Sequence, residues 1–281
     1  MKYVLSIGNT VFHFVSQMTL RLEEEMQPFL IETDVIPDVI VEIHPDYFTA
    51  PKVKGRKLGE DLLLEYYAEE NRGFCLEKGS LSITTYDAEF KKINCYLNTE
   101  RISQAAYSMG NLLRLLPMRM ILQKNHTLFF HASQIAVHDI GILFTAPSGT
   151  GKTTQAKLWK TYRGAKIICN DRTLVRDGKT YSYPVDGSEP VISGESYPLG
   201  AIVLLLQSNE NQIQKLKPKN ALPKLMSQMI FDIWNSKEHM LAIENLIKLV
   251  EKYPVYLLSC TPDQNAVHYL ERQLKKDGVL K

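Results

Sequence analysis

A glycine-rich segment in the middle of the chain constrains its fold more than any other feature. Residues 146–153 fit the pattern of a phosphate-binding loop, which is Ala or Gly, four further residues, Gly-Lys, and then Ser or Thr. Gly149 and Gly151 permit backbone angles and a close approach to a ligand that side chains would block. Backbone N–H groups can then surround an anion at the start of a helix, where the helix dipole favours negative charge. The segment therefore predicts a nucleotide-binding fold.

The same segment supplies groups for phosphate charge and for a metal ion. We expect Lys152 to reach the β- and γ-phosphates and the Thr153 hydroxyl to ligate Mg²⁺. The flanking sequence agrees, because residues 141–145 are typical of a buried strand and residues 152–162 of a helix. An ordinary glycine-rich turn is the alternative, and we favour a nucleoside triphosphate site. Its predicted binding residues are Ala146, Pro147, Ser148, Gly149, Thr150, Gly151, Lys152, Thr153 and Thr154.

Composition excludes several other classes of protein. The 281 residues carry a formal net charge of +2 and are 44% hydrophobic and 23% charged, which gives no reason to expect nucleic acid or a membrane surface as partner. No stretch resembles a signal peptide or a membrane span. The four cysteines are scattered without metal-ligand spacing, so we expect reduced thiols in a cytoplasmic protein.

The first third of the chain is predicted to be β-rich. Strands are expected at residues 3–7, 11–15, 39–43, 81–85 and 93–97, within an amino-terminal domain of residues 1–97 that serves substrate or partner binding. A connecting helix over 98–126 should follow, capped by Asn98 or Thr99 and kinked at Pro117.

Residues 127–281 are predicted to form an α/β domain around the phosphate-binding loop. The fold class is therefore α/β, with a nucleotide-binding core preceded by a smaller β-rich domain. Further strands are expected at 127–131, 134–137, 165–169, 199–206 and 254–259, with helices over 219–234 and 237–252 and a last helix after Thr261.

A carboxylate about twenty residues beyond the loop is the best candidate for a second metal ligand. The helix after Lys152 and the strand 165–169 span similar distances. A right-handed strand–helix–strand crossover should therefore bring this strand back beside the loop strand, with its end near the loop. Asp171 would then lie at the carboxyl edge of the sheet, near Thr153, where open α/β sheets bind ligands. We expect Asp171 to ligate Mg²⁺, the alternative being a solvated acid in a turn.

Three further features are candidates for the same edge. His131 ends a predicted strand and could meet the γ-phosphate or the acceptor, although a strand-end histidine is more often structural. Arg172 could steady a transferring phosphoryl group or pair with an acid. The polar loop 186–190 could cover the site or form a surface turn.

Taken together, these residues resemble the carboxy-terminal domain of the HPr serine kinase/phosphorylase family. The resemblance rests on His131-Ala132-Ser133, the loop at 146–154 and Asn170-Asp171, and covers residues 127–275. Phosphoenolpyruvate carboxykinase is related through the same loop type, and the chain is most similar to diverged HPr-kinase-like proteins associated with modified peptides. The resemblance implies a P-loop core, ATP and Mg²⁺, phosphorylation of a Ser hydroxyl, a role for His131 near the phosphates, and homo-oligomers.

Two departures from the family bear on mechanism and substrate. HPr kinases carry two adjacent acids where this chain has Asn170 and Asp171, so Asp171 would have to serve both metal and proton unless another group substitutes. The Arg-Gly signature of the family is not recognisable around residues 192–198. The HPr protein is therefore not the expected acceptor.

The preferred hypothesis is a kinase that phosphorylates a Ser or Thr hydroxyl on a peptide or protein, with Lys152, Asp171 and His131 as its catalytic residues. Asp171 or His131 would orient or deprotonate the acceptor. The alternatives are a nucleotide-binding or leader-peptide-binding regulator whose catalysis has decayed, and a small-molecule phosphotransferase. A GTPase and a transport ATPase are disfavoured because their signature motifs are missing from the sequence.

Overall fold

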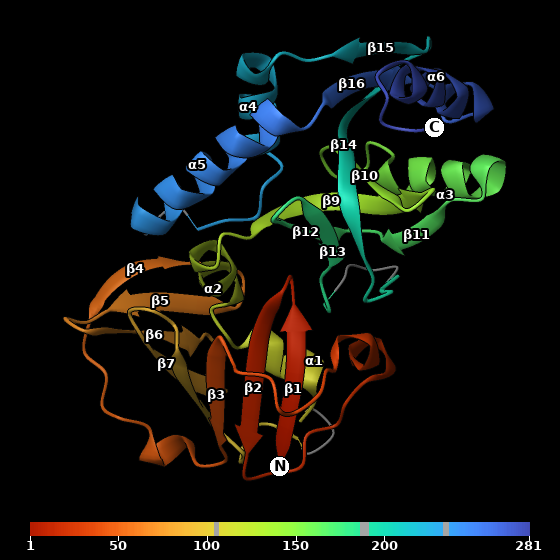
Figure 1. Cartoon of the computed structure of the whole chain (residues 1–281). Helices are drawn as coiled ribbons and strands as arrows, with labels where there is room; N and C mark the ends of the chain where they lie inside the picture. Colours follow the sequence, from red (N-terminus) through yellow and green to blue (C-terminus); the bar gives the residue numbers. More distant parts are fainter. Residues whose placement is uncertain (104–106, 186–190, 233–235) are drawn as a thin grey trace. The chain divides into compact units, whose positions relative to one another are not determined.

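The structure, a computed structural model, divides the chain into two compact units (Figure 1). It describes residues 1–103, 107–185, 191–232 and 236–281, without the side chains of 236 and 237. Unit 1 consists of Met1–Asn125 with Asp232–Ser236, and unit 2 of His126–Phe231 with Lys237–Lys281. Each unit contains a large sheet, so the chain is a mixed α/β protein.

Unit 1 is built on a sheet whose strands follow the order β1-β2-β3-β8-β7-β6-β5-β4. The strands β2, β3 and β8 are parallel neighbours, and the other pairs are antiparallel. Gly8 and Asn9, both with positive φ, form the tight turn between the first two strands. The strands are β1 (Lys2–Ile7), β2 (Thr10–Ser16), β3 (Val39–His44), β4 (Arg56–Glu60), β5 (Leu64–Ala68), β6 (Arg72–Glu77), β7 (Ser82–Asp87) and β8 (Lys92–Leu97), with short 3-10 helices at η1 (Glu24–Phe29) and η2 (Tyr47–Thr49).

The continuous helix predicted over residues 98–126 is wrong. Two short helices, α1 (Met109–Arg114) and α2 (Met118–Lys124), occupy the second half of this segment, and residues 104–106 lie outside the described residues. The first helix begins after Ser108, whose hydroxyl accepts a hydrogen bond from the N–H of Asn111. Pro117 separates the two helices, because proline lacks the N–H that would continue the ladder. Both helices lie within unit 1 and do not form a separate connecting segment.

Unit 2 contains a second large sheet, in the order β10-β9-β12-β13-β14-β16-β15. The strand β10 also pairs with β14 in parallel, and β11 pairs with β9. The strands are β9 (Leu128–Val137), β10 (Ile140–Thr145), β11 (Lys166–Cys169), β12 (Arg172–Arg176), β13 (Lys179–Ser182), β14 (Ser196–Gln207), β15 (Gln212–Lys215) and β16 (Val255–Cys260), and the helices are α3 (Lys152–Arg163), α4 (Pro218–Met226), α5 (Ser236–Lys252) and α6 (Gln264–Lys276).

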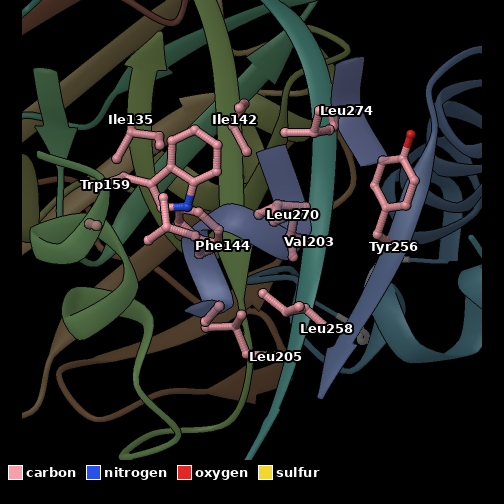
Figure 2. Packing of buried hydrophobic residues seen from close by; sticks show 14 of the residues in the cluster. Ile135, Ile142, Phe144, Trp159, Val203, Leu205, Tyr256, Leu258, Leu270 and Leu274 are labelled. Carbon is pink, nitrogen blue, oxygen red and sulfur yellow. The ribbon is translucent and has the colours of Figure 1, made fainter. Parts of the chain in front are cut away.

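Alternate residues of the central strands of unit 2 pack into two separate cores. Phe144 of β10 belongs to the core under α3 and α6, whereas its neighbour Leu143 belongs to the core that includes residues of α4 and α5. Trp159 of α3 lies against Phe144, with 6.4 Å between ring centroids (Figure 2). Helices therefore cover both faces of this sheet, which holds the end of β10 and the start of α3 in a fixed geometry.

Three predictions for unit 2 need correction. The two strands expected at 127–131 and 134–137 form one strand, β9, because it is paired along its length by β10, β11 and β12. The helix expected over 219–234 ends at Met226, after which the N–H of Ile230 donates to Phe129 O in the neighbouring strand. The return strand β11 lies beside β9 instead of β10, so one strand separates it from the loop strand.

Candidate functional site

The glycine-rich loop connects the end of β10 to the start of α3. Gly149 has φ of 77° and Gly151, the N-cap of α3, has φ of 114°, a region that L-residues with side chains rarely adopt. A β-carbon on Gly149 would meet nothing within 4 Å. The glycine is thus required by the backbone angle and leaves open space in front of the loop.

Lys152 folds back over the loop that precedes it. Its ammonium donates to the carbonyl oxygens of Ala146 at 2.8 Å and Pro147 at 3.4 Å, and the residue is 7% exposed. Burial lowers the pKa of Lys152, and the nearby charge of Asp171 opposes that shift. A phosphate group at the loop would offer this cation a stronger partner than two carbonyl oxygens.

His131 and Asp171 meet across the pair of strands β9 and β12. Residue 172 is the register partner of His131, and the N–H of Ala132 donates to Asp171 O at 2.9 Å. These backbone contacts bring His131 Nε2 within 2.6 Å of Asp171 Oδ1. The carbonyl oxygen of His131 also accepts from the Thr145 hydroxyl at 2.9 Å, which ties the dyad to the end of β10.

The charge environment keeps Asp171 ionised. Its hydrogen bond with His131 is the largest influence and lowers the pKa of the carboxyl group, and electrostatic interactions with His131, Arg172 and Lys152 act in the same direction. Burial opposes them without reversing the shift. A carboxylate with a low pKa is a good metal ligand and a poor proton acceptor at neutral pH.

One cavity of about 450 Å³ contains most of the predicted site residues. Of the others, Ala146 is buried beneath the loop, Pro147 is exposed and Thr150 faces a neighbouring cavity. Lys157 also lines the cavity but was not predicted as a site residue. It lies four residues after Thr153, and this spacing places the two residues on the same face of the helix. The lining residues are His131, Ser148, Gly149, Gly151, Lys152, Thr153, Thr154, Lys157, Asn170 and Asp171.

Arg172 contacts an acid, which is one of the two roles considered for it. Its Nε lies 3.7 Å from Asp171 Oδ2, and its Nη1 donates to Val185 O at 3.2 Å. It is not among the residues that line the cavity. The ion pair with Asp171 is thus present in the structure, and contact with a transferring phosphoryl group stays a prediction. The loop 186–190, considered as a cover for the site, lies outside the described residues.

The donor set fits Mg²⁺ bound together with phosphates. Mg²⁺ sites of this kind use one or two carboxylates, and the remaining positions are taken by water and phosphate oxygens. Thr153 and Asp171 both line the cavity and supply one hydroxyl and one carboxylate. Among the described residues no cluster of three or more His, Cys, Asp or Glu side chains forms an all-protein metal site.

The fold and the site define an α/β protein with a glycine-rich strand-to-helix loop facing a histidine–carboxylate pair. The sequence matches the family described as SynChlorMet cassette protein ScmC over residues 94–275, more than half of the chain. The chain therefore belongs to the ScmC family.

Comparison with solved structures gives a more distant similarity. The Hpr(Ser) kinase/phosphatase from Coxiella burnetii aligns with 53% of this chain and 97% of its own, at 11% sequence identity and a TM-score of 0.29. No curated protein matches the sequence. Among the described residues, no helix combines the length and the apolar character needed to cross a lipid bilayer.

Proposed function

We propose that this protein is an ATP- and Mg²⁺-dependent kinase with a P-loop core that phosphorylates a Ser or Thr hydroxyl of a peptide or protein. The observation that carries the proposal is the meeting of His131 and Asp171, 2.6 Å apart, in the same cavity as the loop that ends in Lys152. A phosphate-binding loop alone supports binding, whereas transfer also requires groups aimed at the metal and at the nucleophile.

Each side chain has a distinct role in this proposal. Backbone N–H groups of residues 148–153 bind the phosphates, and Lys152 exchanges its two carbonyl partners for phosphate oxygens. Thr153 and Asp171 would hold Mg²⁺, which would neutralise part of the negative charge of the phosphates. His131 accepts the proton of the acceptor hydroxyl, because the low pKa of Asp171 makes that carboxylate the weaker base.

Phosphoryl transfer replaces one phosphorus–oxygen bond by another. A bond forms between the acceptor oxygen and the γ-phosphorus, the bond from that phosphorus to the β–γ bridging oxygen breaks, and ADP leaves. The hydroxyl proton passes to His131, which Asp171 orients through their hydrogen bond. This division of roles explains how the site can work with Asn170 in place of a second acid.

Mass spectrometry of serine- and threonine-containing peptides incubated with the full chain and Mg·ATP tests the proposal. We expect one phosphoryl group on a hydroxyl, and turnover that falls about 10²-fold or more in Asp171→Asn. Asp177→Asn, on the exposed turn after β12, is the matched control and should keep full activity. Bound ATP without transfer to any hydroxyl would count against a kinase.

One observation favours a second candidate, a nucleotide-binding regulator without catalysis. Asn170 lines the cavity next to Asp171 and supplies an amide where a second carboxylate would strengthen metal binding. If Asp171→Asn leaves both Mg·ATP affinity and partner binding intact, and the wild-type chain has no turnover, this candidate replaces the kinase.

A further inference from the structure

A second cavity, of about 560 Å³, lies on the other side of the glycine-rich loop. Gly149, Gly151 and Thr154 line both this cavity and the one that holds His131 and Asp171, so the loop is a shared wall. The volume falls within the range of small-molecule sites. A nucleotide whose phosphates occupy the first cavity has a direct path across the glycines into the second.

The far wall of this cavity is formed by the carboxyl ends of two parallel neighbouring strands. Leu205 of β14 and Cys260 of β16 are both buried and give the wall an apolar surface. Gln207, after Leu205 on the same strand, donates from Nε2 to Gly149 O at 3.2 Å and connects this wall to the loop. The carboxyl ends of strands in open α/β sheets are where ligands bind.

Hydrogen bonds fix the outer rim of the cavity. Asn211 donates to the Thr261 hydroxyl at 2.9 Å, and its side-chain oxygen accepts from the N–H of Thr261 at 3.2 Å. The Thr261 hydroxyl in turn donates to Asp263, which caps α6. The cavity therefore has a rigid frame, as expected of a preformed site.

Gln155 gives the cavity a specific polar group. It is 2% exposed, lies one turn into α3, and donates from Nε2 to Cys260 Sγ at 3.3 Å. Its Oε1 is buried and accepts no hydrogen bond from any described residue. Trp159 and Gln134 each also carry a buried polar atom that has no hydrogen-bond partner among the described residues, but neither residue lines this cavity. A buried acceptor left unpaired is costly, so a bound donor would stabilise it.

We infer that this cavity binds the nucleobase of the proposed nucleoside triphosphate, and that Gln155 selects a base with an exocyclic amino group, such as adenine. The bond from Nε2 to Cys260 sets the orientation of the amide, which leaves Oε1 to accept from that amino group. Leu205 and Cys260 contribute the apolar contact that a flat base requires. This inference rests on the proposed function, because it assumes that phosphates occupy the loop.

Calorimetric binding to the full chain tests the inference, with Mg²⁺ and three probes. These are ATP, inosine triphosphate, which has a carbonyl where adenine has its amino group, and inorganic tripolyphosphate. We expect ATP to bind the wild-type chain about tenfold more tightly than inosine triphosphate. Gln155→Leu should weaken ATP by a similar factor and remove the preference, and it should leave the affinity for tripolyphosphate unchanged.

A second variant keeps the test decisive if Gln155→Leu, a substitution at a buried position, does not fold. Asn209 lines the cavity on an exposed turn, so Asn209→Trp fills its mouth without disturbing the core. This variant should weaken ATP at least tenfold and spare tripolyphosphate. Gln214→Trp is the matched control, because Gln214 is an exposed residue of β15 outside both cavities.

The outcomes separate this inference from the proposed function. Equal affinity of the wild-type chain for ATP and inosine triphosphate overturns the role of Gln155. Unchanged ATP binding in Asn209→Trp overturns the placement of the base. A wild-type chain that binds neither ATP nor tripolyphosphate overturns the proposed function and this inference with it. Base-selective binding without phosphoryl transfer supports the inference and contradicts the kinase alone.

Discussion

His131 lowers the pKa of Asp171 through a short hydrogen bond. Because this bond is the largest of the influences that lower the pKa of Asp171, the carboxylate stays charged under conditions in which the same group in an unfolded chain takes up a proton. The orientation that the proposed mechanism needs from Asp171 thus depends on His131, whereas its low pKa depends on His131 together with Arg172 and Lys152.

Replacing His131 should therefore change the stability of the protein in acid. The pKa of Asp171 is lowered from 3.8 in the folded state, so its stabilising contribution is complete above that value and is lost as the pH falls through the folded pKa. In His131→Asn this folded pKa moves back up, and the variant should lose less stability than the wild type between about pH 5 and about pH 2. The expected difference is about 1 kcal/mol or less, measured by urea unfolding.

His138, a histidine away from Asp171, provides the matched control for this experiment. His138 is exposed in the turn between β9 and β10 and has φ of 47°, which asparagine tolerates. His138→Asn should reproduce the wild-type acid profile. An acid profile of His131→Asn that matches the wild type would show that the hydrogen bond does not set the charge of Asp171.

At the scale of elements, α3 determines where Lys152 and Thr153 lie, and its two ends depend on glycines. Gly164 forms the C-cap with φ of 64°, and its N–H donates to Lys160 O at 3.1 Å. A β-carbon on Gly164 would meet nothing within 4 Å, so a substitution there tests the backbone angle alone.

Gly164→Ala should destabilise the protein by about 1–2 kcal/mol, because alanine is unfavourable in the left-handed region. Gly164→Asn should cost less, since asparagine enters this region more readily. Urea unfolding of both variants measures the difference. Equal stability of the two variants would mean that the helix end relaxes to another conformation. Nucleotide binding should survive in both, because the loop is at the opposite end of α3.

Elements with strong local signals could be predicted from the sequence, and elements defined by long-range pairing could not. The loop, β10 and α3 were predicted within a residue or two, because their apolar run and glycines are local features. By contrast, β4 (Arg56–Glu60) is exposed and charged, and only its pairing with β5 makes it a strand. The hairpin of β12 and β13 was missed although Asp177-Gly178, both with positive φ, carries a clear turn signal.

The candidate site shows the same division. The prediction placed Asp171 near the loop by assuming that β11 pairs with the loop strand, whereas β9 separates the two strands. The proximity of Asp171 to His131 depends on the register of β9 with β12, which no sequence pattern specifies. Gln155 appeared in the sequence as an ordinary helix residue, because its unpaired oxygen becomes visible only once β16 brings Cys260 beside it.

At the scale of the whole molecule, the path of the chain is not a simple succession of two segments. Asp232 follows most of the strands of unit 2 in the sequence, yet it belongs to unit 1. In unit 1, Asp232 Oδ1 lies 3.2 Å from Arg119 Nε, and Arg119 also pairs with Asp61.

The buried position of Asp232 leads to a prediction about stability. Asp232 is 1% exposed, and burial raises its pKa from 3.8 to about 6 despite the charge of Arg119. Between these two values the folded protein holds a proton that the unfolded chain has released, so the free energy of unfolding falls as the pH rises from about 4 to about 6. At 1.36 kcal/mol per pKa unit, this loss amounts to roughly 3 kcal/mol.

Asp232→Asn should remove most of that loss, because asparagine is neutral at every pH and Arg119 keeps Asp61 as its partner. Urea unfolding measures the free energy of unfolding of the variant minus that of the wild type. This difference should be about 2–3 kcal/mol larger at about pH 8 than at about pH 4. The exposed Asp34 gives the matched control, since Asp34→Asn should leave the pH dependence unchanged. A variant that loses stability at high pH instead would show that the ion pair with Arg119 outweighs the burial of the charge, and that Asp232 is held in unit 1 by charge.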